Sequence, residues 1–125
     1  MDARLDPDLL HQLIEDLGDD ELVVELAQEL VAALPDRLAA LRRGAAAVGV
    51  PDVDDARRAA HTLKSSARLM GLTALAERAA LLEATTPPWS AELLSDLDVV
   101  ASEAAEALRD WVATALVAGP QGPRP

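Results

Sequence analysis

The chain has 125 residues, half of them hydrophobic, and its 11 basic and 22 acidic residues give a formal net charge of −11. This length suits one domain with a single modest core, and the negative charge disfavours binding to nucleic acid or anionic lipid. Because cysteine is absent, disulfides, thiolate metal sites and cysteine catalysis are excluded. No apolar run approaches a membrane span and the first residues are rich in acids, so we expect a cytoplasmic protein that contacts no membrane.

A short helix is predicted near the start of the chain. Asp6 is a suitable N-cap, Pro7 suits the first helical position, and Gly18 ends the apolar pattern. The segment is unusually apolar for its length, so we expect part of its surface to serve a partner. Its apolar residues are Leu9, Leu10, Leu13, Ile14 and Leu17.

A longer second helix is expected to begin at Asp19 or Asp20, either of which can cap it. Pro35 lies inside its pattern and should bend the helix without ending it, because the periodicity continues in phase. The segment 49–51 then breaks the pattern. The predicted apolar stripe consists of Leu22, Leu26, Leu30, Leu34, Leu38, Leu41, Ala45 and Val48.

Three more helices are predicted in the second half of the chain. Asp52 is expected to cap the third helix, which ends near Gly71, and Thr73 to cap the fourth. The segment 85–88, T-T-P-P, stops the fourth helix, and Ser90 caps the fifth. The apolar stripe of the fifth helix consists of Leu93, Leu97, Val100, Ala104, Ala107, Leu108, Trp111 and Leu116.

The predicted fold class is all-α, because no segment shows the alternation typical of a strand. Four longer helices with short connections imply an antiparallel up-down-up-down four-helix bundle, with the short N-terminal helix added at one end. We expect the domain to cover residues 1–118, followed by a disordered Gly/Pro-rich tail at 119–125. The charged surface favours a monomer.

His61 lies on the polar face of the third predicted helix. At about 100° per residue, Arg57, Lys64, Ser65 and Arg68 fall within about 60° of His61. A solvated histidine on a charged face is one interpretation. The other is a nucleophile, since an accessible neutral imidazole attacks electrophiles and the neighbouring cations would stabilise a phosphoryl group. The opposite, apolar side consists of Ala56, Ala59, Leu63, Ala67 and Met70.

Other catalytic patterns are missing from the chain. It contains no glycine-rich phosphate loop, no H-E-x-x-H and no G-x-S-x-G. No set of carboxylates accompanies His11 or His61, so no metal site is predicted. His11 lies on a different helix and is interpreted as a half-exposed helix residue.

The segment A-H-T-L-K-S-S-A-R-L-M-G, residues 60–71, resembles the signature of histidine-containing phosphotransfer (Hpt) domains, A-H-x-L-K-G-[SA]-[SA]-x-x-x-G. L-P-D-R-L-A-A-L before it and A-L-A-E-R-A-A-L-L-E after it are also similar to the family, so the resemblance extends over roughly residues 5–116. It implies that His61 is phosphorylated on Nε2, that Lys64 helps to hold the phosphoryl group, and that Glu83 can accept a hydrogen bond from Nδ1.

The resemblance also implies roles for residues around the histidine. Ser66 and Ala67 match small positions that let the helices pack closely, and Gly71 matches the glycine that closes the motif. Ser65 stands where the family usually has glycine beside the docking surface; serine is small, and its hydroxyl could bond to the phosphoryl group. The surface expected to meet the phosphoryl group or the partner comprises Arg57, Ser65, Arg68, Gly71, Leu9, Leu13 and Ile14.

The function implied is that of a phosphorelay intermediate, which accepts a phosphoryl group on His61 from a receiver-domain aspartate and passes it to another receiver. Such a protein is a covalent carrier without its own ATP site, not an enzyme. Response-regulator receivers are the expected partners, and a hybrid histidine kinase is a further candidate. No cofactor is expected on this chain, because magnesium would belong to the receiver. Two alternatives stay open: a non-catalytic receiver-binding module, and a chemotaxis-type domain phosphorylated in trans by a kinase.

Overall fold

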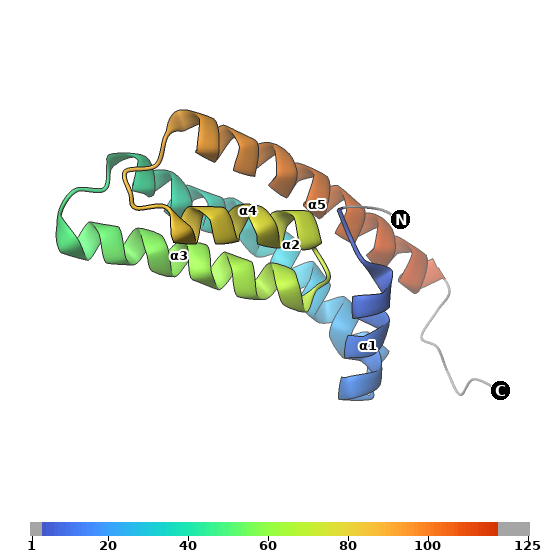
Figure 1. Cartoon of the computed structure of the whole chain (residues 1–125). Coiled ribbons are helices and arrows are strands. Elements are labelled where there is room, and N and C mark those ends of the chain that lie inside the picture. The colour runs from blue at the N-terminus through green and yellow to red at the C-terminus, as the bar shows by residue number, and fades with distance from the viewer. Residues whose placement is uncertain (1–3, 118–125) are drawn as a thin grey trace.

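The computed structural model describes residues 4–117, which form helices joined by short connections (Figure 1). No strand occurs in this part of the chain, and the predicted all-α class is confirmed. The expected domain end at residue 118 and the tail at 119–125 lie outside the described residues. The elements are α1 (Pro7–Leu17), α2 (Asp20–Arg42), the short 3₁₀ helix η1 (Arg43–Ala46), α3 (Gly49–Leu69), α4 (Thr73–Ala84) and α5 (Ala91–Val117).

The four longer helices surround one core. α3 packs against α2 and α4, and α5 packs against α2 and α4, so each of these helices has two neighbours. Figure 1 shows that each helix from α2 to α5 runs back along the one before it. α1 contacts α2 and α3 and crosses one end of the molecule.

The helix ends of the first part of the chain form as their sequences predict. The Asp6 carboxylate accepts a hydrogen bond from the Asp8 backbone N–H at 3.0 Å, and Asp19 accepts one from the Leu22 N–H at 3.1 Å. Gly18 ends α1 in the left-handed conformation, with φ of 68°, and its N–H donates to the Ile14 carbonyl. These caps are local contacts, so the nearby sequence determines them.

Two predicted helix starts are wrong. α3 begins at Gly49 instead of after a cap at Asp52, which lies in its first turn. Pro51 does not break the helix there, because the first backbone N–H groups of a helix have no partner within it. Thr73 is the first residue of α4 instead of its N-cap, and Leu72 precedes it. Ser90 caps α5 as predicted, with its hydroxyl accepting from the Leu93 N–H at 3.1 Å.

The predicted apolar stripes are correct in the middle of the helices and wrong at several ends. α2 ends at Arg42, so Ala45 and Val48 lie beyond it and are exposed, and Leu116 near the end of α5 is exposed as well. Periodicity reports which residues share a face but not whether another helix covers that face. Leu22 is also exposed, because a neighbouring set of residues on α2 faces the core. These buried residues are Val23, Ala27, Leu30, Leu34 and Leu41. The helix continues through Pro35 as expected.

The core consists mostly of alanine and leucine, which allows the helices to approach closely. The buried residues of α3 are Ala56, Ala60, Leu63 and Ala67, and three of these four are alanines. At the end of the molecule opposite α1, the Trp89 indole covers Gly44 so closely that a Cβ at Gly44 would clash with the ring. The backbone N–H of Trp89 donates to the Gly44 carbonyl at 3.0 Å, so this contact ties the segment before α5 to η1.

The turn between α3 and α4 determines which residues of the two helices face each other. Gly71 takes a φ of 71°, and the next N–H, of Leu72, donates to the Ala67 carbonyl at 2.8 Å. His61 lies 10 residues before Gly71 and Glu83 lies 12 residues after it. Because the rise per residue is the same in both helices, the two side chains come level with each other.

Candidate functional site

His61 projects from the exposed side of α3, and 59% of its side chain is accessible to solvent. The neighbouring Ala60 and Leu63 are fully buried on the opposite side. Ala59, expected on the buried face, is only half-buried, while its neighbour Ala60 belongs to the core. The core face is therefore rotated slightly from the prediction, and the imidazole remains on the surface.

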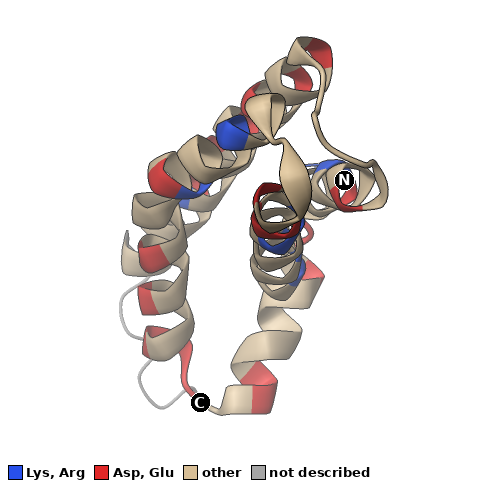
Figure 2. Cartoon of the chain, turned by 90° about the vertical axis from the view of Figure 1, so that its left-hand side faces the viewer, with Lys and Arg blue, Asp and Glu red and all other residues tan. Residues whose placement is uncertain are grey.

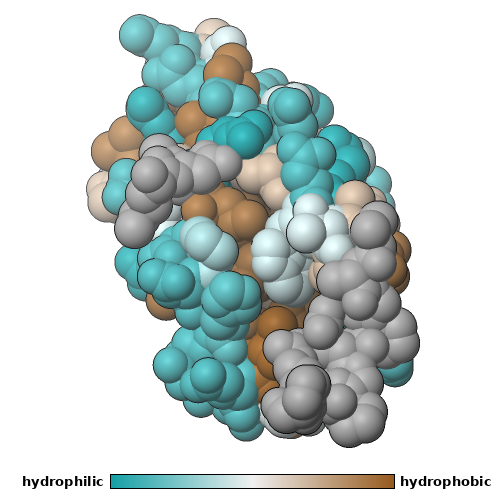
Figure 3. All heavy atoms as spheres, turned by 90° about the vertical axis from the view of Figure 1, so that its right-hand side faces the viewer, coloured by the Kyte–Doolittle hydropathy of each residue, from teal (hydrophilic) through white to brown (hydrophobic). Residues whose placement is uncertain are grey.

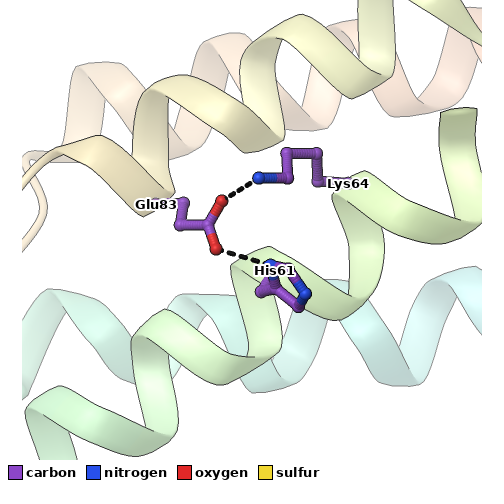
Figure 4. Close-up of polar contacts among 3 residues, drawn as sticks. All are labelled: His61, Lys64 and Glu83. Atoms are coloured by element: carbon purple, nitrogen blue, oxygen red, sulfur yellow. Dashed lines mark hydrogen bonds and ion pairs between the residues drawn. The ribbon is translucent and has the colours of Figure 1, made fainter.

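Glu83 of α4 holds one nitrogen of this imidazole. Its Oε2 lies 2.6 Å from Nδ1 of His61 (Figure 4), so the contact that we expected between these residues is present. A carboxylate oxygen only accepts hydrogen bonds, so Nδ1 carries the proton in this arrangement. Nε2 is then the nitrogen with a free lone pair.

Lys64 is directed toward Glu83 and not toward solvent. Its Nζ donates a hydrogen bond to Oε1 of Glu83, and only 17% of its side chain is exposed. Lys64 was placed on the polar face of this helix beside His61, but its side chain is mostly shielded from solvent. Its position on the helical wheel was correct, but α4 packs beside that edge of α3 and covers it.

The charge of Glu83 depends on Lys64. The hydrogen bond from Lys64 is the largest effect and lowers the pKa of Glu83. Partial burial acts in the opposite direction, and the hydrogen bond to His61 lowers the pKa further. Glu83 is therefore a carboxylate at neutral pH, the form that accepts from Nδ1.

His61, Glu83 and Lys64 form a triad. The other predicted polar residues lie apart from it. Arg57 donates from Nη2 to the Thr86 hydroxyl at 3.1 Å, which places its guanidinium at the connection between α4 and α5. Ser65 and Arg68 remain on the exposed surface of α3, beyond His61. Neither side chain has a hydrogen bond or ion pair with the part of the chain that the structure describes.

Gly71 cannot serve as a partner-binding residue, because it is buried. Its carbonyl accepts the Asp6 N–H at 2.8 Å, and a Cβ added to it would lie 2.7 Å from the Asp6 carbonyl oxygen. Gly71 instead allows the start of α1 to lie directly against the α3–α4 turn.

The predicted docking leucines of α1 are only partly available. Leu9 is 43% exposed, but Leu13 and Ile14 are half-buried and pack against the core. They are less exposed than expected, because α1 uses that side to cover the end of the helices, and their part in docking stays a prediction. Figure 3 shows this end of the molecule, where hydrophobic atoms form a strip between hydrophilic ones.

Two features escaped the prediction. Leu69 is 50% exposed on α3, two residues before Gly71, and its helical angle of about 80° from His61 already places it on the exposed half. The bond between Lys64 and Glu83 was also not predicted. Lys64 and Glu83 had each been placed beside His61. This shared position was the signal from which their hydrogen bond could have been predicted.

The triad has the properties of a nucleophilic imidazole held in one tautomer. Nδ1 is bonded to a carboxylate, Nε2 is free, and the side chain is open to solvent. Among residues 4–117, no group of three or more histidine, aspartate or glutamate side chains is arranged to hold a metal ion. No helix in this range is both long and apolar enough to cross a membrane.

A comparison with known protein families finds one that matches most of the chain. The Hpt domain family matches residues 25–116, which include α3, α4 and all three residues of the triad. Among curated proteins and solved structures, none matches the chain.

Proposed function

We propose that this chain, which belongs to the Hpt domain family, carries a phosphoryl group on Nε2 of His61 between receiver domains of a phosphorelay. Hpt domains are phosphocarrier modules of histidine phosphotransfer and not catalysts in their own right. The observation that carries the assignment to His61 is its 2.6 Å contact with Glu83, which leaves Nε2 unprotonated on an exposed face.

The transfer step needs no group on this chain other than the imidazole. The Nε2 lone pair attacks the phosphorus of an aspartyl phosphate on the receiver. The Nε2–P bond forms as the P–O bond to the aspartate breaks, and the aspartate leaves as a carboxylate. Transfer to a second receiver is the reverse reaction with its aspartate as the nucleophile. Magnesium would be held by the receiver.

Glu83 would stabilise the phosphorylated imidazole. Once Nε2 bonds to phosphorus while Nδ1 keeps its proton, the ring carries a positive charge. The Glu83 carboxylate already faces that Nδ1–H, so the charge develops next to an anion that is in place beforehand. Lys64 would act through Glu83 by keeping it ionised, which makes Lys64 a positioning residue in this proposal.

The partner would dock on the exposed side of α3 near His61. Arg68 is the cation there without a partner in the described residues, so it can meet the acidic surface of a receiver. Ser65 lies between Arg68 and His61. The exposed leucines that accompany them are Leu9 on α1 and Leu69 on α3.

The finer architecture that we propose is an antiparallel four-helix bundle of α2 to α5, with α1 as an additional helix. The closed ring of contacts among α2, α3, α4 and α5 supports it. A monomer and a cytoplasmic location remain predictions.

A labelled receiver tests the function. The receiver phosphorylated with ³²P would be mixed with this chain and Mg²⁺, and the label examined for acid lability and stability in base. We expect labelling of the parent chain and of His11→Gln, the matched control at the other histidine, but not of His61→Gln.

Equal labelling of His61→Gln would contradict the proposal. If no receiver labels the parent chain while a histidine kinase with ATP does, the chemotaxis-type alternative is correct. If neither labels it although a receiver binds, the chain is a non-catalytic binding module.

A further inference from the structure

A cleft of about 740 Å³ lies between the second half of α2, η1 and the first two-thirds of α3. Four alanines and Gly44 are five of its twelve lining residues, and their small size leaves the space open. Three arginines and three aspartates supply most of the remainder: Arg37, Arg43, Arg58, Asp36, Asp52 and Asp55. Small-molecule sites in proteins have volumes in this range.

Arg37 is the lining residue with an unsatisfied hydrogen-bond donor. Its Nε is shielded from solvent and has no hydrogen-bond partner, the one buried side-chain atom in that state among the described residues. A buried donor without an acceptor is unfavourable, and such groups usually have a partner in folded proteins. Asp36, its neighbour in the chain, does not supply one. Because Nε is shielded, an anion in the cleft would bond to the Nη groups of Arg37, which lines the cleft and has no hydrogen bond or ion pair within residues 4–117.

The other charges restrict the kind of anion. Asp55 already bonds to Arg58 at 3.2 Å, so Arg37 and Arg43 are the two arginines of the cleft lining that have no partner within residues 4–117. Asp36 and Asp52 line the same space, and acidic residues predominate over the molecule (Figure 2). A polyanion would be repelled, whereas a small molecule with one anionic group is not.

The cleft is separate from the phosphorylation site, although both use α3. Arg58 and Thr62, which line the cleft, flank His61 on the side away from Lys64 and Glu83. A ligand there would lie beside the proposed docking surface without touching the contact between His61 and Glu83.

We infer that this cleft binds a small molecule through a single carboxylate or phosphate group held by Arg37 and Arg43. Anion binding in this cleft does not depend on phosphorylation of His61. His61→Gln should bind the anion as the parent chain does, so a failed phosphotransfer experiment would leave this result unchanged.

An NMR titration of the full chain tests the site. Inorganic phosphate and acetate would be added separately at constant ionic strength, and the backbone amides followed. We expect saturable shifts at Ala40, Gly44 and Ala59 with at least one anion. Saturation with phosphate alone or acetate alone assigns the class of anionic group. Shifts that never saturate with either anion, or that spread evenly over the helices, overturn the inference.

Matched variants locate the binding. Arg37→Gln should weaken it about tenfold, the effect of losing one hydrogen bond to a charged group. Arg109→Gln, with the same change of charge on the exposed surface of α5, should leave the affinity unchanged. Because Arg37 is half-buried, circular dichroism would verify that Arg37→Gln folds like the parent chain. Arg43→Gln, at an exposed position, provides a second test. Equal binding by the Arg43 and Arg109 variants would contradict the role of the cleft.

Discussion

Nζ of Lys64 donates a hydrogen bond to one carboxylate oxygen of Glu83, whose other oxygen lies 2.6 Å from Nδ1 of His61. The lysine is the only one in the chain, and it is joined to the histidine through the glutamate. Lys64 therefore influences the imidazole by maintaining the charge and direction of Glu83. The three residues form a unit in which each position can be tested separately.

Removing the Glu83 carboxylate should slow phosphorylation of His61. Without an acceptor at Nδ1, the imidazole samples the tautomer with its proton on Nε2, which cannot attack. We expect Glu83→Ala to accept phosphate from a labelled receiver about tenfold more slowly, corresponding to the loss of one charge-assisted hydrogen bond. Glu77→Ala removes an exposed carboxylate from the same helix and should react at the parent rate. Equal rates for the two variants would argue against the tautomer role.

Replacing Lys64 by methionine should raise the pKa of Glu83. The hydrogen bond from Lys64 is the largest effect that lowers this pKa, and the burial effect that remains favours the protonated form. Carboxyl ¹³C shifts followed across the acid range measure the change. Arg68→Met removes a cation from the same helix without touching Glu83 and should leave its pKa in place. A pKa of Glu83 unaltered by Lys64→Met would disprove the coupling.

The same coupling predicts how stability depends on pH. A carboxyl group with a lowered pKa in the folded chain stabilises the fold above its ordinary pKa of 4.5, and the contribution is lost as the pH falls through the lowered value. The unfolding temperatures of the parent and Lys64→Met should therefore differ most above about pH 4.5 and converge below it. Thermal unfolding from about pH 6 to about pH 3 measures this. A difference that stays constant over the range would show that Lys64 contributes only through packing.

Gly71→Ala should destabilise the fold more than Gly18→Ala. Both glycines have a positive φ, 71° and 68°, so alanine strains the backbone at each. Only at Gly71 would the new Cβ also meet the start of α1, at 2.7 Å from the Asp6 carbonyl oxygen. We expect an additional loss of about 1–3 kcal/mol in the free energy of unfolding, measured in urea. Equal losses in the two variants would mean that the contact with α1 is not tightly packed.

The exposed leucines should contribute to docking without affecting the histidine itself. Leu9→Ala or Leu69→Ala is expected to raise the receiver concentration needed for half-maximal transfer by roughly fivefold to tenfold. Labelling of His61 by a small acyl phosphate should be unchanged in both. Leu116→Ala, at a 60% exposed leucine near the end of α5, is the matched control. A loss that also appears with the small phosphoryl donor would place the effect in the site and not in docking.

Local features of the fold could be predicted because a few neighbouring residues determine them. The caps at Asp6, Asp19 and Ser90 and the helix end at Gly18 each depend on contacts over two to four residues. The helical face of His61 follows from the geometry of a single helix in the same way.

Features that depend on a neighbouring helix were the ones missed. Lys64 was expected in solvent because its helical angle does not show that α4 lies beside it. Leu13 and Ile14 were expected on the surface because an apolar helix can face either a partner or its own core. The contact between His61 and Glu83 was predicted only through the family resemblance, because 22 residues and a turn separate the two in the chain.

The nitrogen atom that bonds to phosphorus shows whether His61 reacts in the tautomer that Glu83 holds. The chain, with ¹⁵N-labelled histidine, would be phosphorylated by a receiver and examined by ¹⁵N and ³¹P NMR. We expect a phosphorus coupling to Nε2 of His61 and a proton on Nδ1 that persists through the contact with Glu83. Phosphorus on Nδ1 of His61, on His11 or on a carboxylate would contradict it.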